Sequence, residues 1–183
     1  MRWALISGQR GSDKSGTARR LVAALTAQGL KVAGFTQRRL PSPEGERKRY
    51  LLERIGTGEQ VLLADEGIEG AAQESHCTHA FAKGAFALAL GWLREDGPAA
   101  QVLMLDDVSK LETQGKGHAP AVRWALEQPG RLVVLSVRAK QLFYVMENFG
   151  IQDEPMAVLE LPADAAEEAR FASSVASAVT TSG

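Results

Sequence analysis

The chain has few of the features that would set it apart from ordinary globular proteins. It has one cysteine, Cys77, among 183 residues, which excludes an internal disulfide framework and a zinc site made of cysteines alone. Its net charge is only −1, from 21 basic and 22 acidic residues, so it lacks the large positive field that favours nucleic acids and anionic membranes. We therefore expect neither among its partners.

Long hydrophobic runs are missing as well. The apolar stretch over residues 80–93 contains Lys83 and Gly84, and it falls short of the roughly 20 residues that a membrane-spanning helix needs. The apolar stretch at the amino terminus is too short for a signal peptide. Because 45% of the residues are hydrophobic and 23% charged, as in globular proteins, we expect a single cytoplasmic domain over residues 1–183.

Hydrophobic patterning predicts that strands and helices alternate. Residues 3–7 and 31–36 predict short buried strands, and residues 14–28 predict a helix between them that ends at Gly29. Strand, loop, helix and strand in this order form a βαβ unit, which implies parallel strands. Further strands are expected at residues 102–105, 132–136 and 156–161, and further helices at residues 79–94, 118–128, 140–148 and 163–179.

One pair of apolar runs departs from this alternation. Residues 50–55 and 60–64 flank Gly56, Thr57 and Gly58, a spacing typical of a β-hairpin. Residues 65–77 are rich in glycine, acids and amides and predict a loop. The expected fold class is α/β, with a mostly parallel central sheet and an appended antiparallel hairpin.

The first predicted strand leads into a glycine-rich loop that opens the first helix. The phosphate-binding loop pattern is glycine, four residues, glycine, lysine, and then serine or threonine. The chain matches it at Gly8, Lys14 and Ser15, whereas Asp13 replaces the second glycine. The nucleotide-binding candidates are Gly8, Gln9, Arg10, Gly11, Ser12, Asp13, Lys14, Ser15 and Gly16.

The chemistry of such a loop explains its residue types. Backbone N–H groups at the helix start surround a phosphate, the lysine neutralises the β- and γ-phosphate oxygens, and the hydroxyl coordinates Mg²⁺. The alternative interpretation is an ordinary strand-to-helix turn, in which Asp13 or Ser12 caps the helix.

A second motif favours the nucleotide site. The apolar run at residues 102–105 ends in Asp106 and Asp107, the form of the Mg²⁺-binding strand of phosphate-loop proteins, in which the first acid supports the metal. Asp107 then stands where hydrolases often place a carboxylate that orients the attacking water. We therefore predict Ser15 and Asp106 as the metal site and Lys14 and Asp107 as the catalytic residues.

Residues 6–15, 31–36 and 102–112 together carry a resemblance to a known family. The last segment reads VLMLDDVSKLE, and it is similar to a family strand that ends in Asp-Glu and continues with an apolar residue, Gly-Lys, an apolar residue and Glu. Over residues 3–150 the chain resembles the thermophilic, cancer-related nucleoside-triphosphatase family, in particular a bacterial branch known mainly as a domain of unknown function.

This resemblance implies a three-layer P-loop NTPase fold, dependence on Mg²⁺, and slow hydrolysis of ATP, GTP and other nucleotides. Carried over by position, Lys14 holds the β- and γ-phosphates, and Ser15 and Asp106 serve the Mg²⁺. Asp107 takes the place of the family's water-orienting glutamate. Two further matches have no implied role: Lys110 and Glu112.

The chain departs from the family where function is most sensitive. Asp13 puts a carboxylate at the closest approach of the backbone to the phosphates, and two unit charges 4 Å apart interact by about 4 kcal/mol at an effective dielectric constant of 20. It repels the nucleotide unless it points outward or pairs with Arg10 or Lys14. Asp107 is one methylene shorter than the family's glutamate, and Ser109 replaces a glycine. The alternative to weak hydrolysis is therefore a degenerate phosphate-loop protein, a regulatory module that binds a nucleotide or a partner without turnover.

A basic cluster surrounds a proline-rich turn after the second predicted strand. It consists of Arg38, Arg39, Arg47, Lys48 and Arg49. We interpret it as a solvated loop. The functional alternatives are a lid that faces the phosphates, a surface that binds a partner, or the second-substrate pocket of a small-molecule kinase.

Two other candidates lie outside the main motifs. Arg138 follows the strand predicted at residues 132–136 and is a candidate sensor of the γ-phosphate. His76, Cys77 and His79 are close enough in sequence to suggest a metal site, with His118 as a fourth ligand. We favour incidental histidines in a loop.

Overall fold

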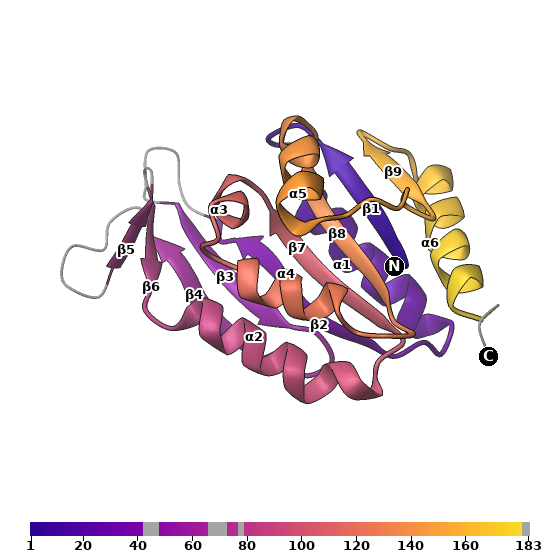
Figure 1. Ribbon diagram of the computed structural model, residues 1–183, viewed down its shortest axis with the longest axis horizontal. Coiled ribbons are helices and arrows are strands. Elements are labelled where there is room, and N and C mark those ends of the chain that lie inside the picture. The colour runs from indigo at the N-terminus through magenta and orange to yellow at the C-terminus, as the bar shows by residue number, and fades with distance from the viewer. Residues whose placement is uncertain (42–47, 66–72, 77–78, 181–183) are drawn as a thin grey trace.

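The computed structural model describes residues 1–41, 48–65, 73–76 and 79–180. These residues form one nine-stranded sheet in the order β5-β6-β4-β3-β2-β7-β8-β1-β9, and helices cover both of its faces (Figure 1). The predicted fold class, an α/β three-layer sandwich, is confirmed. Among the helices that the structure describes, none is long and apolar enough to cross a membrane.

Five strands make up the parallel part of the sheet. They are β1 (Trp3–Gly8), β2 (Val32–Arg39), β7 (Val102–Val108), β8 (Leu132–Arg138) and β9 (Val158–Leu161). Neighbours in the order β2-β7-β8-β1-β9 all pair in parallel. All five predicted strands of this part are present, and the first four extend beyond their predicted carboxyl ends. Most of the added residues are polar or glycine, which hydrophobic patterning does not assign to a buried strand.

Alternate side chains of β1, β2, β7 and β8 pack into two separate cores, because successive residues of a strand point to opposite faces. Trp3 and Leu5 face a core shared with α2 (Ala85–Asp96), α4 (Ala119–Leu126) and α5 (Leu142–Phe149). Ala4 and Ile6 face the other core, shared with α1 (Lys14–Ala27) and α6 (Ala165–Thr180). Burial on both faces explains why these strands are nearly continuous apolar runs.

The antiparallel part of the sheet begins beside β2. The predicted hairpin is present as β3 (Arg49–Arg54) and β4 (Gln60–Asp65), and β3 pairs with β2. The sheet then continues through β6 (His79–Ala82) to β5 (Gln73–His76). Among the described residues the antiparallel part therefore has four strands, whereas the sequence predicted a hairpin of two.

Two secondary-structure predictions were wrong in this region. The segment at residues 65–77 contains β5, where a loop was expected. The helix predicted over residues 79–94 begins only at Ala85, because Gly84 has a left-handed backbone (φ 83°) at the helix start and residues 79–82 form β6. Phe81 and Phe86 contact each other across this boundary, with ring centroids 5.0 Å apart, so apolar periodicity alone did not separate a strand from a helix.

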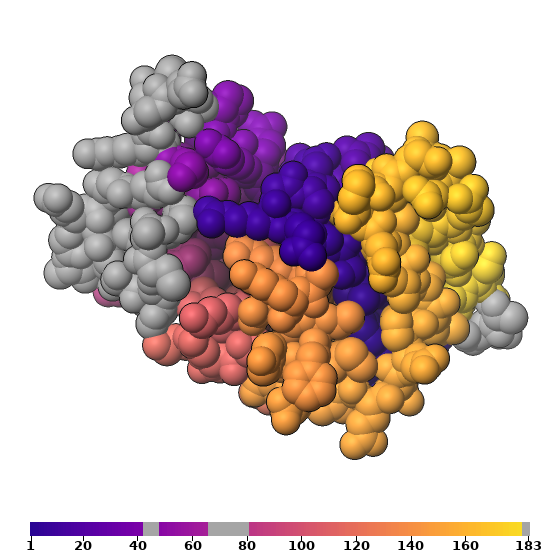
Figure 2. All heavy atoms as spheres, turned by 90° about the horizontal axis from the view of Figure 1, so that it is seen from above, coloured from indigo at the N-terminus to yellow at the C-terminus, as the bar shows by residue number. Residues whose placement is uncertain are grey.

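The carboxyl ends of β1, β7 and β8 meet at one edge of the sheet. Gly8 at the end of β1 is level with Arg138 at the end of β8. The helix after β1 packs on one face of the sheet, whereas the helices after β7 and β8 pack on the other, which is the arrangement that opens a ligand crevice in α/β sheets. Figure 2 looks onto this edge, where the indigo residues near the amino terminus lie between the orange and yellow ones of the carboxyl-terminal half.

Candidate functional site

The loop between β1 and α1 forms a tight turn at the edge of the sheet. The Ser12 N–H and Oγ both donate to the Gln9 carbonyl oxygen, at 3.3 and 2.8 Å. Asp13 is the residue at the start of α1, and no side chain caps that helix end by a hydrogen bond. The alternative interpretation, a turn capped by Asp13 or Ser12, therefore lacks its defining contact. The first N–H groups of α1 remain without a side-chain cap.

Asp13 fits the loop because its backbone is left-handed, with φ 56° and ψ 35°. Aspartate tolerates this conformation better than most residues other than glycine. Its carboxylate points out of the loop, with 65% of the side chain exposed, and Oδ2 lies 3.1 Å from Arg20 Nη1. Its ion-pair partner is therefore Arg20, rather than Arg10 or Lys14 as considered from the sequence. The Arg20 guanidinium therefore offsets part of the negative charge of Asp13.

Arg20 connects this loop to the carboxyl-terminal helix. Its guanidinium donates to both Glu168 carboxylate oxygens of α6, at 2.8 and 2.7 Å, and to Thr17 Oγ1 at 2.9 Å. Since the hydrogen bonds from Arg20 stabilise the ionised form of Glu168, they lower the pKa of that carboxyl group. The start of α1 and the start of α6 are thus held together around one guanidinium.

Lys14 curls back over its own loop. Lys14 is buried, and its Nζ donates hydrogen bonds to the carbonyl oxygens of Gln9 at 2.8 Å and Gly8 at 3.4 Å. Burial lowers the pKa of Lys14, whereas the nearby Asp107 carboxylate raises it. The lysine therefore stands within electrostatic reach of the acids that end β7.

Asp106 lies fully buried at this edge, and both of its carboxylate oxygens accept hydrogen bonds. Ser136 Oγ donates to Oδ1 at 2.7 Å, and the Gln37 backbone N–H donates to Oδ2 at 2.9 Å. These contacts fix the orientation of the carboxylate. Sequence reasoning missed Gln37 and Ser136. The serine that ends the apolar run at residues 132–136 was the available signal for one of them.

Asp107 has a left-handed backbone as well, with φ 55°, where the register of β7 against β8 shifts. Its N–H donates to Ser136 Oγ at 3.3 Å, and Oδ1 lies 3.8 Å from Arg138 Nε. Burial raises the pKa of Asp107 to about 6, against the opposing effect of the Arg138 guanidinium. The residue is thus a stronger base than a solvated aspartate.

Glu112 organises the segment that follows β7. It is buried, and its carboxylate oxygens accept the backbone N–H groups of Ser109 at 2.8 Å and His118 at 3.0 Å. Burial raises its pKa to about 7 in spite of these donors. Glu112 therefore holds the connection between β7 and α4 in place and does not face the phosphate-binding loop as a ligand.

The metal site considered around His118 is not supported. The His118 ring is buried, stacked on Phe35 with centroids 4.2 Å apart and edge-on to Phe86 at 4.7 Å, so it belongs to the core. Cys77 lies outside the described residues, and the structure does not describe the side chains of His76 and His79. In the part of the chain that the structure describes, no cluster of three or more His, Cys, Asp or Glu residues could hold a metal ion.

The basic cluster is only partly described. Arg38 and Arg39 are exposed at the end of β2, and Arg49 Nε lies 3.7 Å from Asp65 Oδ2. Arg47 lies outside the described residues. The solvated-loop interpretation of this cluster stays a prediction.

Comparisons with known proteins agree on one family. A family model described as NTPase matches residues 4–161. The human cancer-related nucleoside triphosphatase has a similar structure, with a TM-score of 0.69 and 21% identity over 100% of both chains. THEP1 from the hyperthermophile Aquifex aeolicus has a TM-score of 0.65 and 16% identity, over 87% of this chain and 89% of that one. No curated protein matches the sequence.

Proposed function

The chain belongs to the NTPase family, and on this premise we propose that it binds a nucleoside triphosphate together with Mg²⁺ and hydrolyses it slowly. The products are the nucleoside diphosphate and phosphate. Residues 8–16 hold the phosphates. ATP and GTP are both substrates in this proposal.

One observation carries the proposal, namely the group of charges around the loop. The charges of Asp106 and Asp107 at the end of β7, and of Arg138 at the end of β8, act on the Lys14 ammonium at the start of α1. Lys14, at a helix start that no side chain caps, and Arg138, at the end of the strand beside β1, favour phosphate oxygens. Two carboxylates beside them serve a metal and a water molecule.

The residues present fit Mg²⁺. The ion prefers hard oxygen donors, and it is usually held by one or two carboxylates together with substrate phosphates. Ser15 supplies a hydroxyl in the first turn of α1, and Asp106 supplies a carboxylate that Ser136 and Gln37 hold in one orientation. When bound there, the ion neutralises charge that develops on the β- and γ-phosphates.

The mechanism uses four groups of the chain. Lys14 exchanges its two carbonyl contacts for phosphate oxygens, and the uncapped N–H groups of α1 donate to the same phosphates. Asp107 accepts a hydrogen bond from a water molecule and aligns it with the γ-phosphorus. Arg138, 3.8 Å from Asp107, stabilises the negative charge of the γ-phosphate oxygens while the bond to the β-phosphate oxygen breaks and the nucleoside diphosphate leaves.

The alternative is a module that binds a nucleotide without hydrolysing it. Asp13 was the main sequence feature in favour of that function, and its carboxylate points outward to Arg20. The shorter side chain of Asp107 is the remaining support for the alternative. Turnover, rather than binding, is therefore what distinguishes the two functions.

Removal of Mg²⁺ provides the direct test. We expect phosphate release from ATP or GTP with Mg²⁺, and a decrease of about 100-fold or more when EDTA removes the ion, since metal stabilisation of the transition state amounts to several kcal/mol. A thermal-shift titration with the Mg²⁺ complexes measures binding separately. Binding without phosphate release would select the non-hydrolysing module. No thermal shift with any triphosphate would contradict nucleotide binding itself.

The pH dependence of hydrolysis tests the role of Asp107. The value of kcat/KM reports ionisation in the free enzyme, so we expect it to rise with pH through about 6 and to level off near neutrality. The reason is that only the ionised carboxylate accepts a hydrogen bond from the attacking water. Asp107→Asn removes this limb together with most of the activity, and a flat wild-type profile between about pH 5 and 8 would contradict the assignment.

A further inference from the structure

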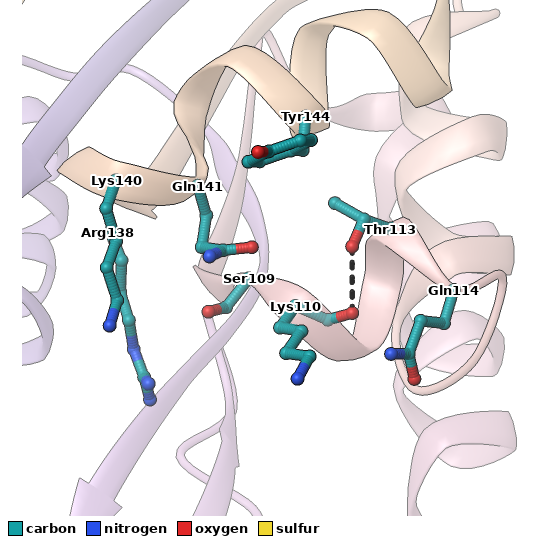
Figure 3. A pocket seen from close by; sticks show the side chains of 8 residues that line it. All are labelled: Ser109, Lys110, Thr113, Gln114, Arg138, Lys140, Gln141 and Tyr144. Carbon is teal, nitrogen blue, oxygen red and sulfur yellow. Dashed lines mark hydrogen bonds between the residues drawn. The ribbon is translucent and has the colours of Figure 1, made fainter.

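A groove lies between α3 (Lys110–Thr113) and the segment formed by η2 (Ala139–Gln141) and α5. We call it the α3–α5 groove. It is an open hollow of about 400 Å³, with room for a small molecule. Its eight lining residues are Ser109, Lys110, Thr113, Gln114, Arg138, Lys140, Gln141 and Tyr144 (Figure 3).

The charged residues that line the α3–α5 groove are all positive. Three of its eight lining residues are cations, from α3, η2 and the end of β8, and none of the eight is an acid. Lys110 and Lys140 are exposed, and neither has a carboxylate partner among the ion pairs of the described residues. Two unpaired ammonium groups and a guanidinium around one concave surface favour a multiply charged anion such as a phosphate monoester.

Tyr144 gives the α3–α5 groove an apolar wall. It lies on α5 with 54% of its surface exposed, and Figure 3 shows its ring edge-on, with one face turned toward the space above Ser109 and Lys110. Gln114 and Gln141 add amide groups, which donate and accept hydrogen bonds. A flat ring of a ligand can stack on the face of Tyr144, and the two amides can form hydrogen bonds with polar substituents of that ring.

The groove touches the proposed nucleotide site through one residue. Arg138 lines the groove, and its Nε lies 3.8 Å from Asp107 Oδ1. Arg138 is also level with Gly8, where the phosphate-binding loop begins. The groove and the proposed nucleotide site therefore share the Arg138 side chain.

From these observations we propose that the α3–α5 groove binds a small phosphate monoester that carries a ring. Lys110, Lys140 and Arg138 hold the phosphate, and Tyr144 holds the ring. The placement of this second ligand beside the terminal phosphate of the nucleotide rests on the proposed function. The ability of the groove to bind the anion does not.

Phenyl phosphate is the smallest probe that contains both parts. We would titrate it by calorimetry into the full chain carrying Lys14→Ala, because this change weakens phosphate binding at the loop and leaves the groove intact. The double change Lys110→Ala and Lys140→Ala in that background is expected to lower the affinity about ten-fold or more, through the loss of two ion pairs. A matched pair of exposed lysines outside the groove, Lys31 and Lys83, provides the control for net charge.

Tyr144→Ala tests the apolar wall separately. Phenyl phosphate is expected to bind about 2- to 10-fold more tightly than inorganic phosphate to the protein with Tyr144, and equally to the variant without it, because the difference is the ring contact. Circular dichroism verifies that each variant is folded.

Two results would overturn the proposal. One is phenyl phosphate affinity that is unchanged by the loss of Lys110 and Lys140. The other is an equal loss in the control pair Lys31→Ala and Lys83→Ala, since this would reflect net charge alone. Failure of the proposed nucleotide function is seen in a different measurement, the triphosphate titration of the wild-type chain, so the two failures are distinguishable.

Discussion

Replacing Lys14 by alanine is expected to lower kcat/KM for Mg²⁺-ATP hydrolysis by about 10²- to 10³-fold, the usual effect of removing one preorganised group that stabilises transition-state charge. The reason is that Lys14 supplies the cation nearest the β- and γ-phosphates in the proposed site. Steady-state phosphate release measures the effect. Lys31→Ala, which removes an exposed lysine at the opposite end of β2, is the matched control and is expected to have no effect.

Thermal unfolding separates this result from a loss of structure. Lys14 is buried, and burial lowers its pKa, so its removal takes away a charge that folding has to desolvate. The thermal midpoint of Lys14→Ala is therefore expected to stay within a few degrees of wild type. A normal rate of phosphate release in this variant would contradict the phosphate-binding role of the loop.

Gly34→Ala is expected to have the largest effect on stability, a loss of about 3–5 kcal/mol. Gly34 lies in the middle of β2 with φ 119°, where other residues are strained. A Cβ at this position would run into the Met104 carbonyl oxygen of the neighbouring strand β7. Since that oxygen belongs to the backbone, relief requires the two central strands to separate.

Denaturant unfolding measures this change, and a second glycine offers the control. Gly91 lies in the interior of α2, is exposed, and has open space where a Cβ would be. Gly91→Ala is therefore expected to stabilise the protein by about 0.5–1 kcal/mol, as alanine does inside helices. Equal effects of the two substitutions would show that a Cβ at position 34 does not meet the Met104 carbonyl oxygen.

Much of this fold was predictable from the sequence because its central strands are buried on both faces. Continuous apolar runs are a strong signal for the central strands. The edge strand β9 and the hairpin at residues 50–64 are partly exposed, and shorter apolar runs predicted them. The pattern failed at residues 79–82, because a run of four residues is too short for its periodicity to distinguish a strand from the start of a helix. Residues 79–82 form a strand because they pair with β4, which is distant in sequence.

The candidate site was predictable only where a motif marks it. The loop and the two acids after residue 105 have a recognisable spacing, whereas Gln37 and Ser136 have none, because their roles arise from strand pairing. Ser136 touches Asp106 and Asp107 only because β8 lies beside β7. The partner of Asp13 was also unpredictable, since Arg20 lies two turns along the helix and is held there by Glu168.

The left-handed backbone at position 13 has a consequence for finding proteins of this kind. Glycine, asparagine and aspartate are interchangeable in that conformation at modest cost, provided that a neighbouring cation compensates the acid. A sequence search that insists on the second glycine passes over every such chain. A pattern that accepts any of these three residues, with arginine seven positions later, matches a chain such as this one.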